Sequence, residues 1–302
     1  MAGRRIETDR PLEELAAFAV CDSSGAPGLA TLADDPRVPA AGPRREGEAV
    51  YSGPAWIGNR MRATACTFSP AGFDLEIEGA GRFFVAADGR GAAVLAPAPG
   101  APDALLVEVA LGPLLILVLA LGGVFCLHAS AVALEAGDAP PRALAFLGPS
   151  GSGKSTLAAG LACSESGLRR LADDVLPLRV REGDLQVRPR FPQLKLPADR
   201  QPAAGAPEGL PLAGLFLLAP SEDSRAGRGE VGLEELSSRD AALALVRYTA
   251  AARLFAPDLL ERHLGAAAIV AGRLPVRRLT YPWLGRPVPG LAEALVAGLE
   301  GT

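Results

Sequence analysis

The chain has 302 residues, 49% of them hydrophobic, and a formal net charge of −4. A chain of this length and apolar content can bury its own core without stapling metals or disulfides, and it is long enough for one large domain or two small ones. The net negative charge argues against a protein that coats nucleic acid, so we expect no nucleic-acid partner.

Cysteine usage and the first residues bear on the compartment. Cys21, Cys66, Cys126 and Cys163 form no C-x-x-C pair, which favours buried thiols in a reducing compartment. The first 15 residues, "MAGRRIETDRPLEEL", contain no apolar stretch of the kind a secretory signal needs. We therefore expect a cytoplasmic protein.

Residues 1–108 carry short apolar runs separated by turn signals. The clearest pattern is the hairpin predicted over 82–96, with Asp88-Gly89 at its turn. A Pro-rich stretch, 96–104, is the expected boundary. The sequence thus predicts a small β-rich N-terminal domain, 1–108, that carries no recognisable chemistry, followed by a second domain, 109–302.

The second domain opens with an apolar run, 109–134, that contains no charged residue. By length it could cross a bilayer, and a membrane-linked binding module is an alternative that this run leaves open. However, Pro113 and the pair Gly122-Gly123 interrupt it, and His128 is a poor neighbour for lipid. We favour a buried helix over about 111–121, a glycine turn and a buried strand over about 124–134, with no stable membrane insertion.

Beyond this run the predicted elements alternate. Strands are expected at 142–147, around "LRRLADDVLPLRV", at 212–220 and at 274–282, and helices at 154–164, 239–255 (capped by Ser237 or Ser238) and 290–300. Alternation of this kind predicts an α/β domain in which helices cover a sheet.

The most informative stretch joins the strand 142–147 to the helix 154–164. It fits G-x-x-x-x-G-K-[ST] in the strand–loop–helix setting that this motif requires. Its glycines allow positive φ, so that backbone N–H groups can surround a phosphate at the helix N-terminus. Lys154 would reach the β- and γ-phosphate oxygens, and Ser155 would ligate Mg²⁺. The predicted ATP-binding residues are Gly148, Pro149, Ser150, Gly151, Ser152, Gly153, Lys154, Ser155 and Thr156.

An acidic pair, Asp173-Asp174, follows the loop helix by a few residues. In P-loop ATPases and GTPases the metal-binding Asp usually ends a strongly apolar strand, whereas here "LRRLA" precedes the pair. This context favours one carboxylate that accepts a proton from an attacking hydroxyl and a second that orients the metal or Lys154. A solvated acidic turn is the alternative. His128, on the strand before the loop strand, is expected at the nucleotide edge of the sheet, or else as a core histidine bonded to backbone.

Other charged residues carry weaker signals. Lys195 lies in a Pro-broken basic segment that could bring a cation to the transferred phosphoryl group, although such a run is more often a solvated face. His263 is expected on a surface helix. The remaining candidates of this kind are Arg188, Arg190, Arg200, Arg247 and Arg253.

The stretches "LHASAVAL", "ALAFLGPSGSGKSTLAAGLA", "LADDVLPL" and "RPRFPQLKL" resemble the HPr kinase/phosphorylase-like serine kinases, in particular short relatives encoded beside peptide-maturation genes. The resemblance covers roughly residues 105–300. It implies a fold shared with phosphoenolpyruvate carboxykinases, a P-loop on a mixed sheet. It also implies Asp173 as general base, Asp174 as support for metal or base, and His128 as the site histidine.

The resemblance stops short of one feature. The long C-terminal signature that true HPr kinases use for the reverse, phosphorolytic reaction has no clear counterpart, which speaks against phosphorylase activity and against HPr as the acceptor. We therefore expect an ATP- and Mg²⁺-dependent kinase that phosphorylates a hydroxyl, such as a serine of a peptide or small protein. A P-loop ATPase or nucleotide-dependent switch and a small-molecule kinase stay open, as does a homo-oligomer.

Overall fold

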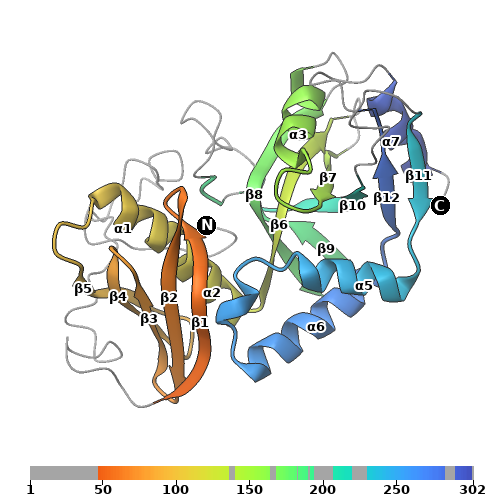
Figure 1. Cartoon of the computed structure of the whole chain (residues 1–302). Coiled ribbons are helices and arrows are strands. Elements are labelled where there is room, and N and C mark those ends of the chain that lie inside the picture. Colours follow the sequence, from red (N-terminus) through yellow and green to blue (C-terminus); the bar gives the residue numbers. More distant parts are fainter. Residues whose placement is uncertain are drawn as a thin grey trace, which may run out of the picture. The chain divides into compact units, whose positions relative to one another are not determined.

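The computed structural model describes residues 47–135, 140–163, 168–181, 183–189, 191–193, 207–219, 230–282 and 290–300. The chain divides into two compact units (Figure 1). Of the described residues, 47–124 and 251–262 belong to the first unit, and 125–250 and 263–300 to the second. The division differs from the predicted boundary at residue 108 because the apolar helical segment before residue 122 packs with the N-terminal sheet.

The first unit contains a five-stranded antiparallel sheet in which each strand pairs with the next along the chain. Its strands are β1 (Glu48–Ile57), β2 (Arg60–Ser69), β3 (Gly72–Ile77), β4 (Gly81–Ala86) and β5 (Ala92–Pro97). The predicted hairpin is present as β4 and β5. At its turn the Arg90 N–H donates to Asp88 Oδ1 over 2.8 Å, and Gly89 has a φ of 64°.

The apolar segment before residue 122 is helical, and it starts earlier than predicted. It consists of α1 (Asp103–Val109), η3 (Ala110–Leu114) and α2 (Leu115–Leu121), with a kink at Gly112, before Pro113. Among the described residues, this segment alone is both long enough and apolar enough to span a membrane. Inside the protein, 56% of that stretch is buried. One face packs on the N-terminal sheet, where the shared core includes Phe73, Leu75, Phe83, Val109, Leu114 and Leu117.

The second unit contains a seven-stranded sheet in the order β11-β12-β10-β7-β6-β8-β9. The strands are β6 (Val124–Leu134), β7 (Arg142–Leu147), β8 (Leu168–Arg181), β9 (Asp184–Val187), β10 (Leu210–Leu218), β11 (Gly232–Glu235) and β12 (Val276–Thr280). Strand β10 is parallel to β7 and β12, whereas β6 runs antiparallel to β7 and β9 antiparallel to β8. The predicted α/β class with a mixed sheet is therefore confirmed. The short strands β9 and β11 were not predicted.

Helices cover both faces of this sheet (Figure 1). Helices α5 (Ser238–Arg247) and α6 (Pro257–Ala271) contribute Leu245 and Val270 to one core. Helices α3 (Lys154–Cys163) and α7 (Leu291–Glu300) contribute Leu157 and Leu295 to the other. Val132 and Leu134 of β6 belong to the core under α3 and α7, whereas Ala131 and Ala133 belong to the other core, because side chains alternate along a strand.

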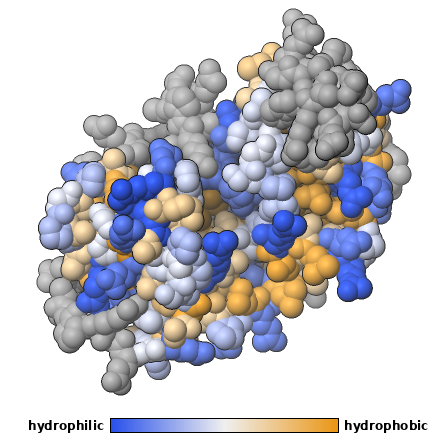
Figure 2. Space-filling model, in the orientation of Figure 1, coloured by the Kyte–Doolittle hydropathy of each residue, from blue (hydrophilic) through white to orange (hydrophobic). Residues whose placement is uncertain are grey.

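Two details of α5 and α6 correct the predictions. The helix expected over 239–255 begins as predicted, with Ser237 as its N-cap accepting from the Asp240 N–H, but it ends at Arg247. His263 does lie on a helix, α6, yet it is 6% exposed rather than on the surface. The helix faces turned to solvent carry exposed Leu243 on α5 and exposed Leu264 on α6, and Figure 2 shows hydrophobic residues gathered over these helices.

The expectation about the thiols holds in part. Cys66 and Cys126 are buried, while Cys163 at the end of α3 is exposed. Burial raises the pKa of the Cys126 thiol to about 12, so this thiol stays protonated at neutral pH. Cys21 lies outside the described residues.

Candidate functional site

The glycine loop connects β7 to α3 and has the backbone that its sequence predicts. Gly148, Gly151 and Gly153 have φ values of 154°, 77° and 91°, a region that side chains with a Cβ rarely adopt. A Cβ on Gly148 would lie 2.6 Å from Ser152 Oγ. The loop can therefore close tightly only with glycine at these positions.

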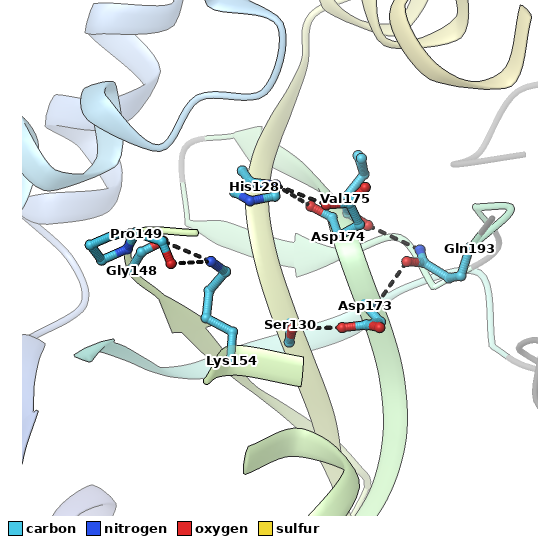
Figure 3. Close-up of polar contacts among 9 residues, drawn as sticks. All are labelled: His128, Ser130, Gly148, Pro149, Lys154, Asp173, Asp174, Val175 and Gln193. Atoms are coloured by element: carbon cyan, nitrogen blue, oxygen red, sulfur yellow. Dashed lines mark hydrogen bonds and ion pairs between the residues drawn. The ribbon is translucent and has the colours of Figure 1, made fainter. Parts of the chain in front are cut away.

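The loop holds its lysine inward (Figure 3). Lys154 is 7% exposed, and its Nζ donates to the carbonyl oxygens of Gly148 over 2.7 Å and of Pro149 over 3.0 Å. Ser152 Oγ is buried and has no hydrogen-bond partner among the described residues. A buried hydroxyl and an ammonium within one loop fit a bound phosphate, which accepts from both.

Strand β8 carries the acidic pair, and the carboxylate of Asp173 is held from two sides. Its Oδ1 accepts from Ser130 Oγ of β6 over 2.9 Å, and its Oδ2 lies 2.6 Å from Arg170 Nη2. The side chain is 7% exposed. A carboxylate has about four lone-pair positions, so these two contacts leave capacity for a further donor.

Asp174 has an unusual backbone, with a φ of 126° although it is not glycine. Ordinary strand geometry sends consecutive side chains to opposite faces. Here the twist at Asp174 interrupts the alternation, so that both carboxylates contact residues of β6: Asp173 contacts Ser130, and Asp174 contacts His128. The strained conformation thus brings two adjacent acids into one site, as strain often does at functional positions.

The contacts of His128 define its tautomer. Its Nδ1 lies 3.0 Å from the carbonyl oxygen of Asp174 and 3.1 Å from the Oδ1 of the same residue. A carbonyl oxygen only accepts, so Nδ1 carries a hydrogen, and the neutral ring keeps its lone pair on Nε2. The backbone of His128 is fixed as well, since its N–H donates to the Tyr248 carbonyl over 2.7 Å. His128 is accordingly part of the acidic cluster and not an isolated core histidine.

The strand register relates the loop to the acids. Strand β6 lies between β7 and β8, and Ser130 pairs with Phe146, two residues before Gly148. Two inter-strand steps, about 9–10 Å, therefore separate the loop strand from the acidic strand. His128 and Ser130 lie on the face of β6 that continues to Val132, which packs in the same core as Leu157 of the loop helix α3. The loop helix and the acids consequently share one face and one end of the sheet.

Three residues that the sequence analysis did not single out contact the acidic pair: Ser130, Arg170 and Gln193. A signal existed for two of them. Ser130 is two residues from His128 on a strand, which puts both on one face, and Gln193 lies within "RPRFPQLKL", a stretch already noted for its resemblance. Nothing in the sequence marked Arg170.

Other predicted candidates are found elsewhere. Arg188 donates to the Glu208 carbonyl over 2.9 Å, and burial together with Arg179 lowers the pKa of its guanidinium. Arg247 lies over the ring of Tyr248. Arg253, in the first unit, lies over the ring of Tyr51. Lys195, Arg190 and Arg200 lie outside the described residues.

The donor set fits magnesium that arrives with a nucleotide. The predicted ligands are Ser155, exposed at the first turn of α3, and Asp174, whose side chain is 31% exposed. Among the described residues, no group of three or more His, Cys, Asp or Glu could hold a metal ion. Mg²⁺ normally takes only one or two protein ligands, together with substrate phosphates and water, and both residues offer the hard oxygen that this ion prefers.

No protein-family model matches this chain. No curated protein sequence matches it either.

Proposed function

We propose that this chain is an ATP-dependent, Mg²⁺-requiring kinase of the HPr kinase-like type, which transfers the γ-phosphoryl group of ATP to a hydroxyl. The acceptor we favour is a serine of a peptide or small protein. The observation that carries the proposal is the arrangement around β6: a glycine loop ends the strand on one side, two carboxylates lie on the strand on the other, and His128 and Ser130 of β6 contact those carboxylates.

The loop supplies the nucleotide site. Its backbone N–H groups and the N-terminus of α3 bind the phosphates, with the Ser152 hydroxyl as an additional donor. Lys154, which donates to two loop carbonyls, would turn its ammonium to the β- and γ-phosphate oxygens. Ser155 and Asp174 would hold Mg²⁺, which neutralises the charge that spreads over the transferred oxygens.

The carboxylates supply the proton acceptor. As the acceptor oxygen bonds to the γ-phosphorus, the bond from that phosphorus to the β–γ bridging oxygen breaks and ADP leaves. The hydroxyl proton passes to Asp173, whose carboxylate is held by Ser130 and Arg170. A positioned carboxylate of this kind contributes about 10²–10⁴-fold to such a step.

Exposure makes Asp174 a competing proton acceptor. Its side chain is 31% exposed against 7% for Asp173, and an incoming hydroxyl reaches an exposed oxygen more easily. Asp173→Asn and Asp174→Asn separate the roles. If Asp173 takes the proton, its variant binds ATP with Mg²⁺ normally but does not transfer. If Asp174→Asn instead keeps a normal Mg²⁺ dependence and does not transfer, Asp174 is the proton acceptor and Asp173 is not.

The test of the function is ATP turnover with and without an acceptor. Purified full-length chain is incubated with ATP, Mg²⁺ and a library of short peptides that carry one serine, beside a matched library in which alanine replaces it. The kinase proposal predicts ADP release that rises only with the serine library, together with phosphoserine in the peptides. Equal ADP release in all mixtures supports an ATPase or nucleotide switch instead.

We further propose a cytoplasmic protein without stable membrane insertion or nucleic-acid partners. The apolar helix Asp103–Leu121 supports the lack of membrane insertion alone, because 56% of this stretch is buried inside the protein. Extraction without detergent is the measurement that checks it.

A further inference from the structure

Gln193 bonds the backbone of β8 on both sides of the strained residue Asp174. We propose that Gln193 is a positioning residue that keeps Asp173 and Asp174 directed toward β6. The catalytic consequence rests on the kinase function proposed above, whereas the structural part can be tested without any activity.

Both the oxygen and the nitrogen of the Gln193 side-chain amide form hydrogen bonds with the backbone of β8. Its Oε1 accepts from the Asp173 N–H over 2.8 Å, and its Nε2 donates to the Val175 carbonyl over 3.0 Å. The Nε2 also lies 3.4 Å from the Phe191 carbonyl. Gln193 is 2% exposed. Because an N–H must meet an acceptor and a carbonyl must meet a donor, the partners fix which end of the amide points to which residue.

These two hydrogen bonds lie where the backbone needs support. Asp174 has a φ of 126°, a conformation that persists only where the surroundings hold it. Ser130 and Arg170 contact the carboxylate of Asp173. His128 Nδ1 contacts the carbonyl oxygen of Asp174 itself. Gln193 bonds the residues immediately before and after Asp174, and it thereby fixes the segment from which both carboxylates project (Figure 3).

The acid pair depends on this support because its geometry is tightly constrained. A carboxylate displaced by about 1 Å from a reacting hydroxyl can cost about 10²-fold in rate. Loss of the two hydrogen bonds would let the backbone at Asp174 relax toward ordinary strand geometry, in which one carboxylate would turn away from β6. Nucleotide binding by the glycine loop, which lies on a different strand, would be unaffected.

The experiment uses full-length chain and three substitutions. Gln193→Met removes both hydrogen bonds but keeps the length and approximate volume of the side chain. Gln193→Glu keeps an oxygen that can accept from the Asp173 N–H but cannot donate to the Val175 carbonyl. Gln186→Met is the matched control on β9, where Gln186 accepts from Arg179 over 2.8 Å and lies outside the acidic cluster.

The first readout is amide hydrogen exchange at Asp173, with no substrate present. We expect exchange at least about tenfold faster in Gln193→Met than in the parent chain, because its N–H loses a buried acceptor, and no change in Gln186→Met. An unchanged rate at Asp173 in Gln193→Met overturns the proposal. This readout holds whether or not the chain transfers phosphate, so the failure of the kinase proposal and the failure of this one are distinguishable.

The second readout is phosphoryl transfer to the serine peptide library. We expect kcat to fall about 10²-fold in Gln193→Met and in Gln193→Glu, with the KM for ATP within about twofold and with Gln186→Met equal to the parent chain. A purely stabilising role predicts a lower melting temperature and an unchanged kcat per folded molecule, which overturns the positioning role. In a chain that carries both Asp173→Asn and Asp174→Asn, Gln193→Met should add less than about twofold, because it acts through those two residues.

Discussion

Each unit of the protein contains a buried aspartate paired with an arginine, and the two pairs differ in a way that separates a structural contact from a candidate site. In the first unit Asp74 contacts Arg82 over 2.8 Å, and in the second unit Asp173 contacts Arg170 over 2.6 Å. The aspartate side chains are 4% and 7% exposed, and the arginines 21% and 17%. By distance and burial alone, the two pairs are equivalent.

Their surroundings are different. Asp74 on β3 lies opposite Phe84 on β4, and Arg82 is two residues before Phe84 on β4. The pair is therefore an ordinary diagonal contact between neighbouring strands. Arg170 and Asp173 lie three residues apart on one strand, where regular geometry would put them on opposite faces. The alternation is broken between them, because Leu171 and Ala172 both pack in one core.

The second pair also lies among further polar side chains, which the first pair lacks among the described residues. Ser130 and Gln193 bond to Asp173, and His128 bonds to Asp174. The glycine loop follows β7, which is two strands away from the acidic strand β8. A buried Asp–Arg pair is thus no indication of function by itself. Strain at a non-glycine residue, converging polar groups and a nearby phosphate loop together make the case.

The largest expected effect comes from Asp173→Asn. An amide cannot accept the proton, so we predict a loss of about 10³-fold or more in the rate of phosphoryl transfer, with the affinity for ATP preserved. The measurement is single-turnover transfer to the serine peptides, with ATP binding followed separately. Transfer within tenfold of the parent chain would show that this carboxylate is as structural as that of Asp74.

Lys154→Ala tests the other half of the site. Removal of one preorganised donor to a transferring group typically costs about 10²–10³-fold, and we expect that loss in kcat/KM for ATP. The chain should still fold, although its thermal unfolding midpoint falls somewhat, because the buried ammonium of Lys154 donates to two loop carbonyls. Full activity in this variant would falsify the assignment of the glycine loop.

Asp74→Asn is the matched variant in the first unit. It removes the carboxylate charge that contacts Arg82, and breaking a fully buried pair costs about 3–5 kcal/mol. Because Arg82 is one-fifth exposed, we expect about 2–3 kcal/mol, measured by denaturant unfolding. Transfer activity per folded molecule should be unchanged, and a loss comparable to that of Asp173→Asn would remove the distinction between the two pairs.

The smallest expected effects come from replacing two glycines that differ in backbone conformation. Gly265 lies within α6, and a Cβ there would meet nothing within 4 Å. Gly265→Ala should therefore stabilise the chain by about 0.5–1 kcal/mol. Gly151 also has open space around it, but its φ is 77°, so Gly151→Ala should destabilise the loop by about 1–2 kcal/mol. Unfolding curves of the two variants should thus shift in opposite directions.

Local signals were enough to predict part of this molecule. The glycine loop, the strand before it and the helix after it are contiguous in sequence. Its three glycines have the positive φ values that were predicted. The order of strands and helices gave the α/β class for the same reason. The acidic pair was found because its two members are adjacent to each other and close to the loop.

Contacts between distant residues could not be predicted in the same way. Ser130 and Asp173 are 43 residues apart, and Gln193 and Asp173 are 20 apart, so each contact depends on how strands and connections come together. The positive φ of Asp174 could not be predicted, because the residue is neither glycine nor asparagine. The unusual geometry follows from tertiary contacts that hold the residue, not from its own preference.

The early end of α5 has a similar origin. The helical pattern continues through residues 248–255 without Gly or Pro, yet the helix ends at Arg247. The Tyr248 carbonyl accepts from the His128 N–H, and the Ala250 N–H donates to the Cys126 carbonyl. These residues pair with the start of β6 instead of continuing the helix, because tertiary hydrogen bonds override a weak local preference.

In the proposed reaction the glycine loop and the acids act on one nucleotide and pass its phosphoryl group to a hydroxyl. The most direct test adds ATP labelled at the γ-phosphate and purified chain to a nucleotide-free lysate of the source cells, and mass spectrometry locates the label. We expect labelled phosphoserine with the parent chain and with Asp74→Asn, but none with Asp173→Asn. Label found only as inorganic phosphate, released equally fast by the parent chain and Asp173→Asn, would contradict it.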